Sequence, residues 1–275
     1  MYLHSRPARA DKPNEDYVAA AGGTLTQAIL LDGAGGPSEL PTGCRHGTPW
    51  YVAQLADAAM AHMRNPMIGL KSALQRAIAT VTDEHRDYSC DLDHPGTPSS
   101  TVVMVRHMAD TVEYLVLGDS TFVADVNGEI VAVSDKRIDQ VGADLRKAMA
   151  ASPTGMPEHQ AARIRFVEHQ RRMRNKPGGY PCVGTVPEVA HEALTGTLPS
   201  AEVRRISLLS DGATRFVEFG LGLWTDLFDI LGSATPGRLF DQVREAEAED
   251  PKGERWPRAK RHDDIAAIYV EGAEL

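Results

Sequence analysis

The sequence has few cysteines and no long apolar run, and both scarcities narrow the class of protein. Only three cysteines occur in 275 residues, namely Cys44, Cys90 and Cys182. Their odd number and wide separation indicate a reducing compartment, and their spacing matches no zinc motif. The N-terminal segment has no apolar core of the kind that a signal peptide needs. No stretch approaches the roughly 18 apolar residues of a membrane span. We therefore expect a cytoplasmic protein that does not contact membranes.

The sequence also has too little positive charge for a typical nucleic-acid-binding protein. Its formal net charge is −9, with 29 Lys and Arg against 38 Asp and Glu. A negative protein repels phosphate backbones, but it attracts divalent cations where its carboxylates converge. Hydrophobic residues make up 42% of the chain and charged residues 24%, which is an ordinary globular composition. We expect no nucleic-acid partner and a monomeric protein.

Several common catalytic signatures are missing as well. The stretch ILLDGAGG, residues 29–36, places Asp32 before glycines that miss both the dinucleotide-binding spacing and the P-loop pattern. No G-x-S-x-G, H-E-x-x-H or tyrosine-phosphatase loop occurs. The stretch CDLDHPGT lacks the preceding apolar strand of haloacid-dehalogenase phosphatases, and lone histidines such as His107 and His191 are more typical of structural positions. Asp32 is therefore either a turn residue or a ligand on a bare loop.

Apolar periodicity predicts an α+β protein whose strands come in runs and do not alternate with helices. A strand pair is expected around Gly22–Gly23, and Asn127–Gly128 is a strong hairpin signal. Pro66 separates two expected helices. Helices are expected within 48–86, 139–176, 215–231 and 237–249, and strands within 17–33, 100–134, 203–211 and 263–270.

Acidic residues recur where apolar strands end. Asp32, Asp119 and Asp211 each follow an apolar run with a glycine beside them. Asp263 and Asp264 precede the last strand, and Glu15 and Asp16 precede the first long one. A single such residue is usually a turn residue, but strand ends can meet at one edge of a layered sheet, where carboxylates bind a hard divalent cation. The set predicts a metal site.

These motifs, taken in order, resemble the type 2C metal-dependent protein Ser/Thr phosphatases, the PPM family. The matching stretches are NEDY, LLDGAGG, TPSSTVVMV, LGDS, LLSDG and DDIAAIYV, and they cover nearly the whole chain outside about 140–200. The resemblance implies a single catalytic domain over 1–275, with a central antiparallel β-sandwich flanked by helices on both sides and a variable flap-like insertion at about 140–200. It also implies hydrolysis of phosphoserine and phosphothreonine monoesters by a hydroxide that bridges two Mn²⁺ or Mg²⁺ ions.

The resemblance assigns roles to the acidic residues. Asp32 would bridge the two ions, and the Gly33 carbonyl would bind one of them. Asp16 would orient metal-bound water and act with Arg9 as the catalytic pair. The remaining implied metal ligands are Asp211 and Asp263 for one ion, Glu15 for the other, and Asp119 for a third.

The match departs from the family at two positions. The family places a phosphate-binding Arg four residues before Glu15, where this chain has Asp11. We expect Arg9 to bind the substrate phosphate, with Arg6 behind it. Arg215 replaces a carboxylate of the third metal site, which predicts that this site is weak or empty and that Arg215 pairs with Asp119.

The flap-like region contains a basic stretch, RIRFVEHQRRMRNK, at residues 163–176. It is either a solvated helix face or a basic surface for a phosphorylated protein partner. Two further readings of the whole chain stay open. One is a catalytically weakened, phosphatase-like regulatory or binding module, and the other is a phosphatase of a small phosphorylated metabolite.

Overall fold

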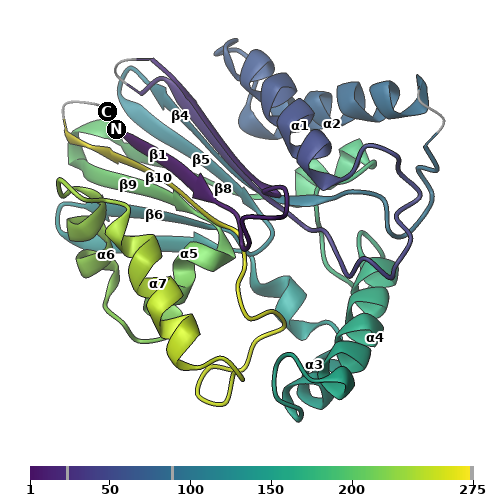
Figure 1. Cartoon of the computed structure of the whole chain (residues 1–275). Helices are drawn as coiled ribbons and strands as arrows, with labels where there is room; N and C mark the ends of the chain where they lie inside the picture. Colours follow the sequence, from purple (N-terminus) through teal and green to yellow (C-terminus); the bar gives the residue numbers. More distant parts are fainter. Residues whose placement is uncertain (23–24, 88–89, 273–275) are drawn as a thin grey trace.

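Two antiparallel sheets form a sandwich with helices on its outer faces (Figure 1). The computed structural model describes residues 1–22, 25–87 and 90–272. The first five-stranded sheet has the order β1 (Tyr2–Arg6), β10 (Ile265–Glu271), β9 (Val203–Leu209), β6 (Thr121–Val126) and β7 (Glu129–Ser134). The second five-stranded sheet has the order β2 (Asp16–Ala21), β3 (Gln27–Gly33), β4 (Ser100–Met108), β5 (Thr111–Leu117) and β8 (Leu194–Pro199). The expected α+β sandwich is therefore confirmed.

The helices form the outer layers. α1 (Thr48–Met63) and α2 (Leu70–Asp87) pack on the second sheet, and α5 (Asp211–Glu218), α6 (Trp224–Leu231) and α7 (Arg238–Glu249) pack on the first. α3 (Ala143–Ala150) and α4 (Pro157–Met173) lie beyond one end of the sandwich (Figure 1). Short 3-10 helices span Lys136–Gln140, Pro187–Glu192 and Ser200–Glu202. No helix in the described part of the chain is long and apolar enough to cross a membrane.

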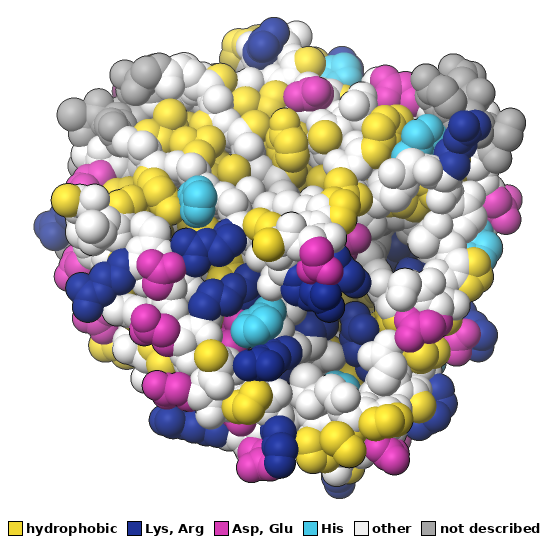
Figure 2. All heavy atoms as spheres, in the orientation of Figure 1, with side chains coloured by type: hydrophobic (Ala, Val, Ile, Leu, Met, Phe, Trp, Pro, Cys, Tyr) yellow, Lys and Arg dark blue, Asp and Glu magenta, His cyan; other side chains and the backbone are white. Residues whose placement is uncertain are grey.

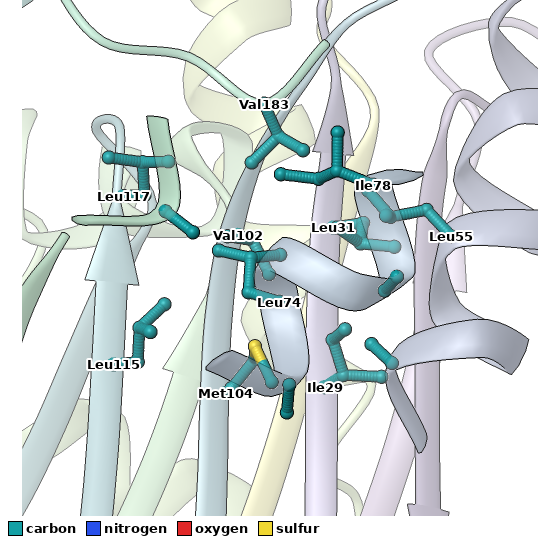
Figure 3. Close-up of a cluster of buried hydrophobic side chains, with 14 of the residues drawn as sticks. Ile29, Leu31, Leu55, Leu74, Ile78, Val102, Met104, Leu115, Leu117 and Val183 are labelled. Atoms are coloured by element: carbon teal, nitrogen blue, oxygen red, sulfur yellow. The ribbon is translucent and has the colours of Figure 1, made fainter. Parts of the chain in front are cut away.

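The central strands are apolar throughout because both of their faces are buried. On β3, Ile29 and Leu31 pack against α1 and α2, whereas Leu30 packs against the other sheet. The strand's period of two sends successive side chains to opposite faces, so a strand between two cores needs apolar residues at every position. Figure 3 shows the helix-facing cluster, in which Leu55 and Leu74 meet the side chains of β3 and β4.

The sequence did not predict β1 or β8. Both are edge strands whose side chains are half-buried or exposed, so their apolar content is too low to distinguish them from loops. The helix expected over 215–231 is two helices, because Gly220 takes a φ of +70° and ends α5. The Asn127–Gly128 hairpin between β6 and β7 is confirmed, whereas Gly23 of the expected first hairpin lies outside the described residues.

The register of the strands brings the acidic residues to one end of the sandwich. Asp16 on β2 lies directly opposite Asp32 on β3, and Thr101 on β4 lies opposite Asp32 on the other side. The end of β9 leads into α5 at Asp211, and β10 begins just after Asp263. These strand ends belong to two different sheets, and the sandwich places them side by side.

Candidate active site

Acidic residues from several separate segments line one cavity of about 230 Å³ at this end of the sandwich. Asp32 ends β3, Asp119 follows β5, Asp211 begins α5, and Asp263 precedes β10. The convergence expected from the sequence is therefore present. The cavity is also lined by Lys260, by the backbone of residues 33–35 and by side chains of α4.

Asp32 connects the two halves of the site. Its Oδ2 accepts a hydrogen bond of 3.2 Å from the backbone N–H of Asp211, at the start of α5. The N-terminus of a helix carries partial positive charge, so this contact favours a carboxylate there. The backbone carbonyl of Asp32 accepts a hydrogen bond of 2.9 Å from Ser100 Oγ on β4. The residue is held from both sides while its carboxylate faces the cavity.

The acidic side chains raise one another's pKa. Burial raises the pKa of Asp32 well above its ordinary value, and Asp16 and Asp211 add to the shift. Burial and Asp263 raise the pKa of Asp211 to about 7. Asp16 is buried, and its Oδ2 has no hydrogen-bond partner among the described residues. Such a cluster binds protons or cations tightly, so these donors fit a divalent metal ion, whose charge would offset the repulsion.

Two basic side chains compensate part of this negative charge at Asp263. Lys260 Nζ lies 2.6 Å from Asp263 Oδ1, and Arg215 donates to Oδ2 at 3.2 Å. Although burial opposes ionisation, these two cations lower the pKa of Asp263. The neighbouring Asp264 serves the backbone, because its oxygens accept from the N–H groups of Ala8 at 2.6 Å and Glu15 at 2.8 Å. Asp263 therefore faces the cavity and Asp264 does not line it.

The expected pairing of Arg215 with Asp119 is wrong. Arg215 instead forms an ion pair with the fully buried Glu247 on α7, in addition to its contact with Asp263. Glu247 also binds Arg244 Nη1 and His262 Nδ1. α5 and α7 are neighbours in the outer layer, so Arg215 on α5 lies within reach of Glu247 on α7.

The glycine loop after Asp32 makes room for Glu15. A Cβ at Gly35 would lie 2.1 Å from Glu15 Oε2, and a Cβ at Gly33 would lie 2.5 Å from the Glu15 carbonyl oxygen. The backbone N–H of Gly33 donates to that carbonyl at 3.1 Å. The absence of side chains at these positions therefore lets the Glu15 carboxylate lie against the loop, beside the cavity.

A second, larger cavity of about 800 Å³ adjoins the first. Arg163, Arg171, Lys260 and Asp263 line both cavities, and Glu15 lines the larger one. Figure 2 shows a hollow on this face of the molecule, with Lys and Arg side chains gathered around it. The two cavities are therefore lined by acidic residues near the strand ends and by basic residues of α4.

Arg163 is the basic residue best placed to bind an anion. Its guanidinium is half-buried between the two cavities, and its Nε has no hydrogen-bond partner in the described part of the chain. Arg9 lines the larger cavity and forms an exposed ion pair with Asp11, with 2.6 Å between Nη2 and Oδ2. Its role as a phosphate ligand stays a prediction. Neither Arg163 nor Lys260 was singled out from the sequence as a site residue, because Arg163 is one of several basic residues on a helix and Lys260 lies in an irregular loop.

Several solved structures share the fold of this chain. Stp1 of Staphylococcus aureus matches with a TM-score of 0.56 and 13% identity, over 98% of this chain and 94% of that one. The catalytic domain of the serine/threonine phosphatase PstP, solved with two manganese ions, matches with a TM-score of 0.54 and 15% identity, over 98% of this chain and 96% of that one. PppA of Pseudomonas aeruginosa matches with a TM-score of 0.56 and 15% identity, over 98% and 96%. The fold is that of bacterial serine/threonine phosphatases.

Sequence comparison names the family. The profile of protein phosphatase 2C matches residues 5–244, whereas a comparison with the curated proteins gives no match. The chain belongs to the protein phosphatase 2C family, and its class of enzyme is protein-serine/threonine phosphatase. The resemblance drawn from the ordered motifs is confirmed.

Proposed function

We propose that this enzyme hydrolyses phosphoserine and phosphothreonine monoesters with the help of two divalent cations, Mn²⁺ or Mg²⁺. The observation that carries the proposal is the buried carboxylate cluster of Asp32, Asp211 and Asp263 around one cavity. A family member of the same fold contains two manganese ions. The residues that would hold the cations are Glu15, Asp32, the Gly33 carbonyl, Asp211 and Asp263, with Asp119 at a weaker third position.

Bound cations would supply a nucleophilic water near neutral pH and would offset charge on the phosphoryl oxygens. The chain's own residues would orient the water molecule and bind the substrate phosphate. The Oδ2 of Asp16, which has no hydrogen-bond partner in the described part of the chain, is a buried acceptor that can orient a water molecule beside Asp32. Asp32 lies directly opposite Asp16 in the β2–β3 register. Arg163 on α4 and Lys260 beside Asp263 would bind the phosphate oxygens, with Arg9 at the outer rim.

The first prediction is that hydrolysis requires the carboxylate cluster and a divalent cation. Asp32→Ala should lower kcat for an aryl phosphate by about a thousandfold or more, because a ligand shared by both cations contributes several kcal/mol to transition-state stabilisation. Chelation should abolish turnover of the wild-type enzyme, and added Mn²⁺ should restore it. Initial rates with phosphopeptide and aryl phosphate substrates provide the measurement.

Asp57→Ala is a matched control, because Asp57 is an exposed residue on α1, away from the cavities. It should keep wild-type rates. Full activity of the wild-type enzyme in excess chelator, or near wild-type rates in Asp32→Ala, would overturn the proposal. Hydrolysis of small phosphorylated metabolites without hydrolysis of phosphopeptides would favour the metabolite phosphatase, and no turnover of either would favour a regulatory module.

A further inference from the structure

Two cysteines and two histidines meet in a cluster that does not line the acidic cavity. Cys44 and His46 lie in the loop that enters α1, His85 lies in the last turn of α2, and Cys90 follows α2. Their four ligand atoms all lie within 4.8 Å of one another. The cysteine spacing, which matches no zinc motif, did not predict this cluster. The signals in the sequence are two pairs that each join a cysteine to a histidine, C-x-H at Cys44 and His46 and H-x₄-C at His85 and Cys90.

The distances within this cluster match a tetrahedral metal site. With Zn–S bonds of about 2.3 Å and Zn–N bonds of about 2.0 Å, such a site separates its sulfurs by about 3.8 Å and each sulfur from a ring nitrogen by about 3.5 Å. The two Sγ atoms lie 3.7 Å apart. Cys44 Sγ lies 3.7 Å from His46 Nδ1 and 3.4 Å from His85 Nε2. Cys90 Sγ lies 3.5 Å from His46 Nδ1.

The surroundings hold the two imidazoles in place. His85 is fully buried and stacks against Tyr51, with ring centroids 5.9 Å apart and nearly parallel planes. His46 stacks on Trp50 at 4.1 Å. The Nδ1 of His85 has no hydrogen-bond partner among the described residues, and its Nε2 points to Cys44. The imidazole therefore makes its polar contact within the cluster, which fits a nitrogen positioned to bind a cation there.

We propose that Cys44, His46, His85 and Cys90 bind one structural zinc ion. Two thiolates and two imidazoles in tetrahedral arrangement are the donor set that selects Zn²⁺ over the hard Mn²⁺ and Mg²⁺ ions of the acidic cavity. Four protein ligands fill the coordination sphere and leave no position for a substrate or a reactive water. The ion thus stabilises the structure and takes no part in hydrolysis.

The zinc ion would cross-link the two loops that flank the larger cavity. Its ligands belong to the loop before α1, to the last turn of α2 and to the segment after α2. The two non-helical segments also meet where the Asp91 N–H donates to the Gly43 carbonyl at 2.9 Å. Arg171 of α4 donates to the Pro41 carbonyl at 3.1 Å, and Arg174 donates to the Thr97 carbonyl at 3.0 Å. The zinc site would therefore hold in place the loops that Arg171 and Arg174, at the C-terminal end of α4, contact.

A disulfide between Cys44 and Cys90 is the competing use of the same atoms. Their Sγ atoms are 3.7 Å apart, whereas a disulfide needs about 2.05 Å. The two sulfurs are therefore separate, at the distance that one tetrahedral ion would require.

The second prediction concerns metal content. The full-length protein, purified under reducing conditions and dialysed against a weak chelator, should contain about one zinc per chain by elemental analysis. Cys44→Ser combined with Cys90→Ser should lose it, and Cys182→Ser, which changes a buried cysteine outside the cluster, should keep it. Asp32→Ala should also keep its zinc, so the result is independent of the proposed hydrolysis.

Cobalt substitution of the wild-type chain tests the same site if the double variant does not fold. Replacing zinc with Co²⁺ should give the visible absorption of a tetrahedral site with two thiolates. The acidic cavity is lined by one cysteine, Cys182, so Cys182→Ser should keep this absorption. Absence of both zinc and this absorption would overturn the proposal. So would zinc retained by the double variant, or a Cys44–Cys90 disulfide found by thiol counting in the protein purified under reducing conditions.

Discussion

At the scale of single residues, the glycines beside Asp32 explain how a carboxylate cluster fits into a tight space. Gly33 and Gly35 differ in what they avoid. A side chain at Gly35 would meet the carboxylate of Glu15, which is the movable end of a flexible side chain, whereas one at Gly33 would meet the Glu15 backbone. The two positions should therefore respond differently to the same substitution.

The third prediction contrasts these two glycines. Gly35→Ala should displace the Glu15 carboxylate and lower kcat/KM about a hundredfold, because a shift of about 1 Å in a positioned group has that effect. Its free energy of unfolding should change by less than about 1 kcal/mol. Gly33→Ala should instead lower the free energy of unfolding by about 1–3 kcal/mol, since the backbone must move. Rates and denaturant titrations provide the two measurements.

Gly69→Ala is the control, because a Cβ there has no neighbour within 4 Å. It should leave both quantities unchanged. Equal losses of stability in Gly33→Ala and Gly35→Ala would contradict the assignment of Gly35 to the placement of Glu15.

At the scale of elements, the orientation of α4 determines which residues of the basic stretch line the cavities and which are exposed to solvent. The two interpretations drawn from the sequence each hold for part of it. Arg163 and Arg171 line the cavities, and Arg174 hydrogen-bonds the loop before β4, so these residues are no solvated face. The exposed basic residues are Arg165, Arg172 and Lys176. Since Arg165 and Arg172 lie about two helical turns apart, they share one outward face.

The fourth prediction is that this exposed face attracts the partner but has no part in hydrolysis. Replacing Arg165, Arg172 and Lys176 with Glu should lower kcat/KM for an acidic phosphopeptide by about tenfold, because charges at a rim act mainly on association. The rate with a small aryl phosphate should be unchanged. Added salt should weaken the effect, since exposed charges are screened over about 10 Å at 0.1 M.

Arg171→Glu provides the contrasting variant, because Arg171 lines both cavities and binds the Pro41 carbonyl. It should lower the rates with both substrates. If the triple variant lowers both rates equally, the face supports the folding of α4 and the residues around it. If it lowers neither, the face is merely solvated.

At the scale of the whole molecule, the sandwich forces carboxylates together, and without a cation this lowers the stability of the protein. Burial and neighbouring charge raise the pKa of Asp211 to about 7. An unfolded aspartate titrates near about 3.9. The folded state therefore holds this proton more tightly than the unfolded state does. Below about pH 4 both states are protonated, and the folded state loses stability as the pH rises through about 7.

The fifth prediction follows from this sign. In chelator, Asp211→Asn should be as stable as the wild type at acidic pH. As the pH rises through about 7, the wild type should lose stability, so that Asp211→Asn becomes the more stable of the two. With Mn²⁺ present the order should reverse, because only the wild type gains the full binding free energy, about 2.7 kcal/mol at a concentration of 100 times Kd. Thermal unfolding across pH measures both effects.

Asp241→Asn is the control for the general loss of a carboxylate, because Asp241 is exposed and pairs only with Arg6 among the contacts described. A difference between the wild type and Asp211→Asn that is independent of pH would contradict the prediction. So would the absence of any reversal with Mn²⁺.

The sequence by itself determined the class of fold and the order of its main elements. Runs such as ILL in β3 and VVMV in β4 are apolar at every position because two cores flank them, and this pattern is readable in one dimension. The ordered acidic motifs identified the family before any geometry was known. The sequence did not predict the edge strands β1 and β8, because their partly exposed side chains are too polar to give the apolar pattern of a strand.

Only the tertiary structure decided which side chains meet. Glu15 and Asp264 are 249 positions apart, yet a backbone N–H and a carboxylate join them at 2.8 Å. The partner of Arg215 proved to be Glu247, and the cluster of Cys44, His46, His85 and Cys90 had no counterpart in the cysteine spacing. Local sequence sets the period and the ends of each element, because these depend on nearby residues. Contacts between elements depend on how the layers pack, and a one-dimensional pattern does not contain that information.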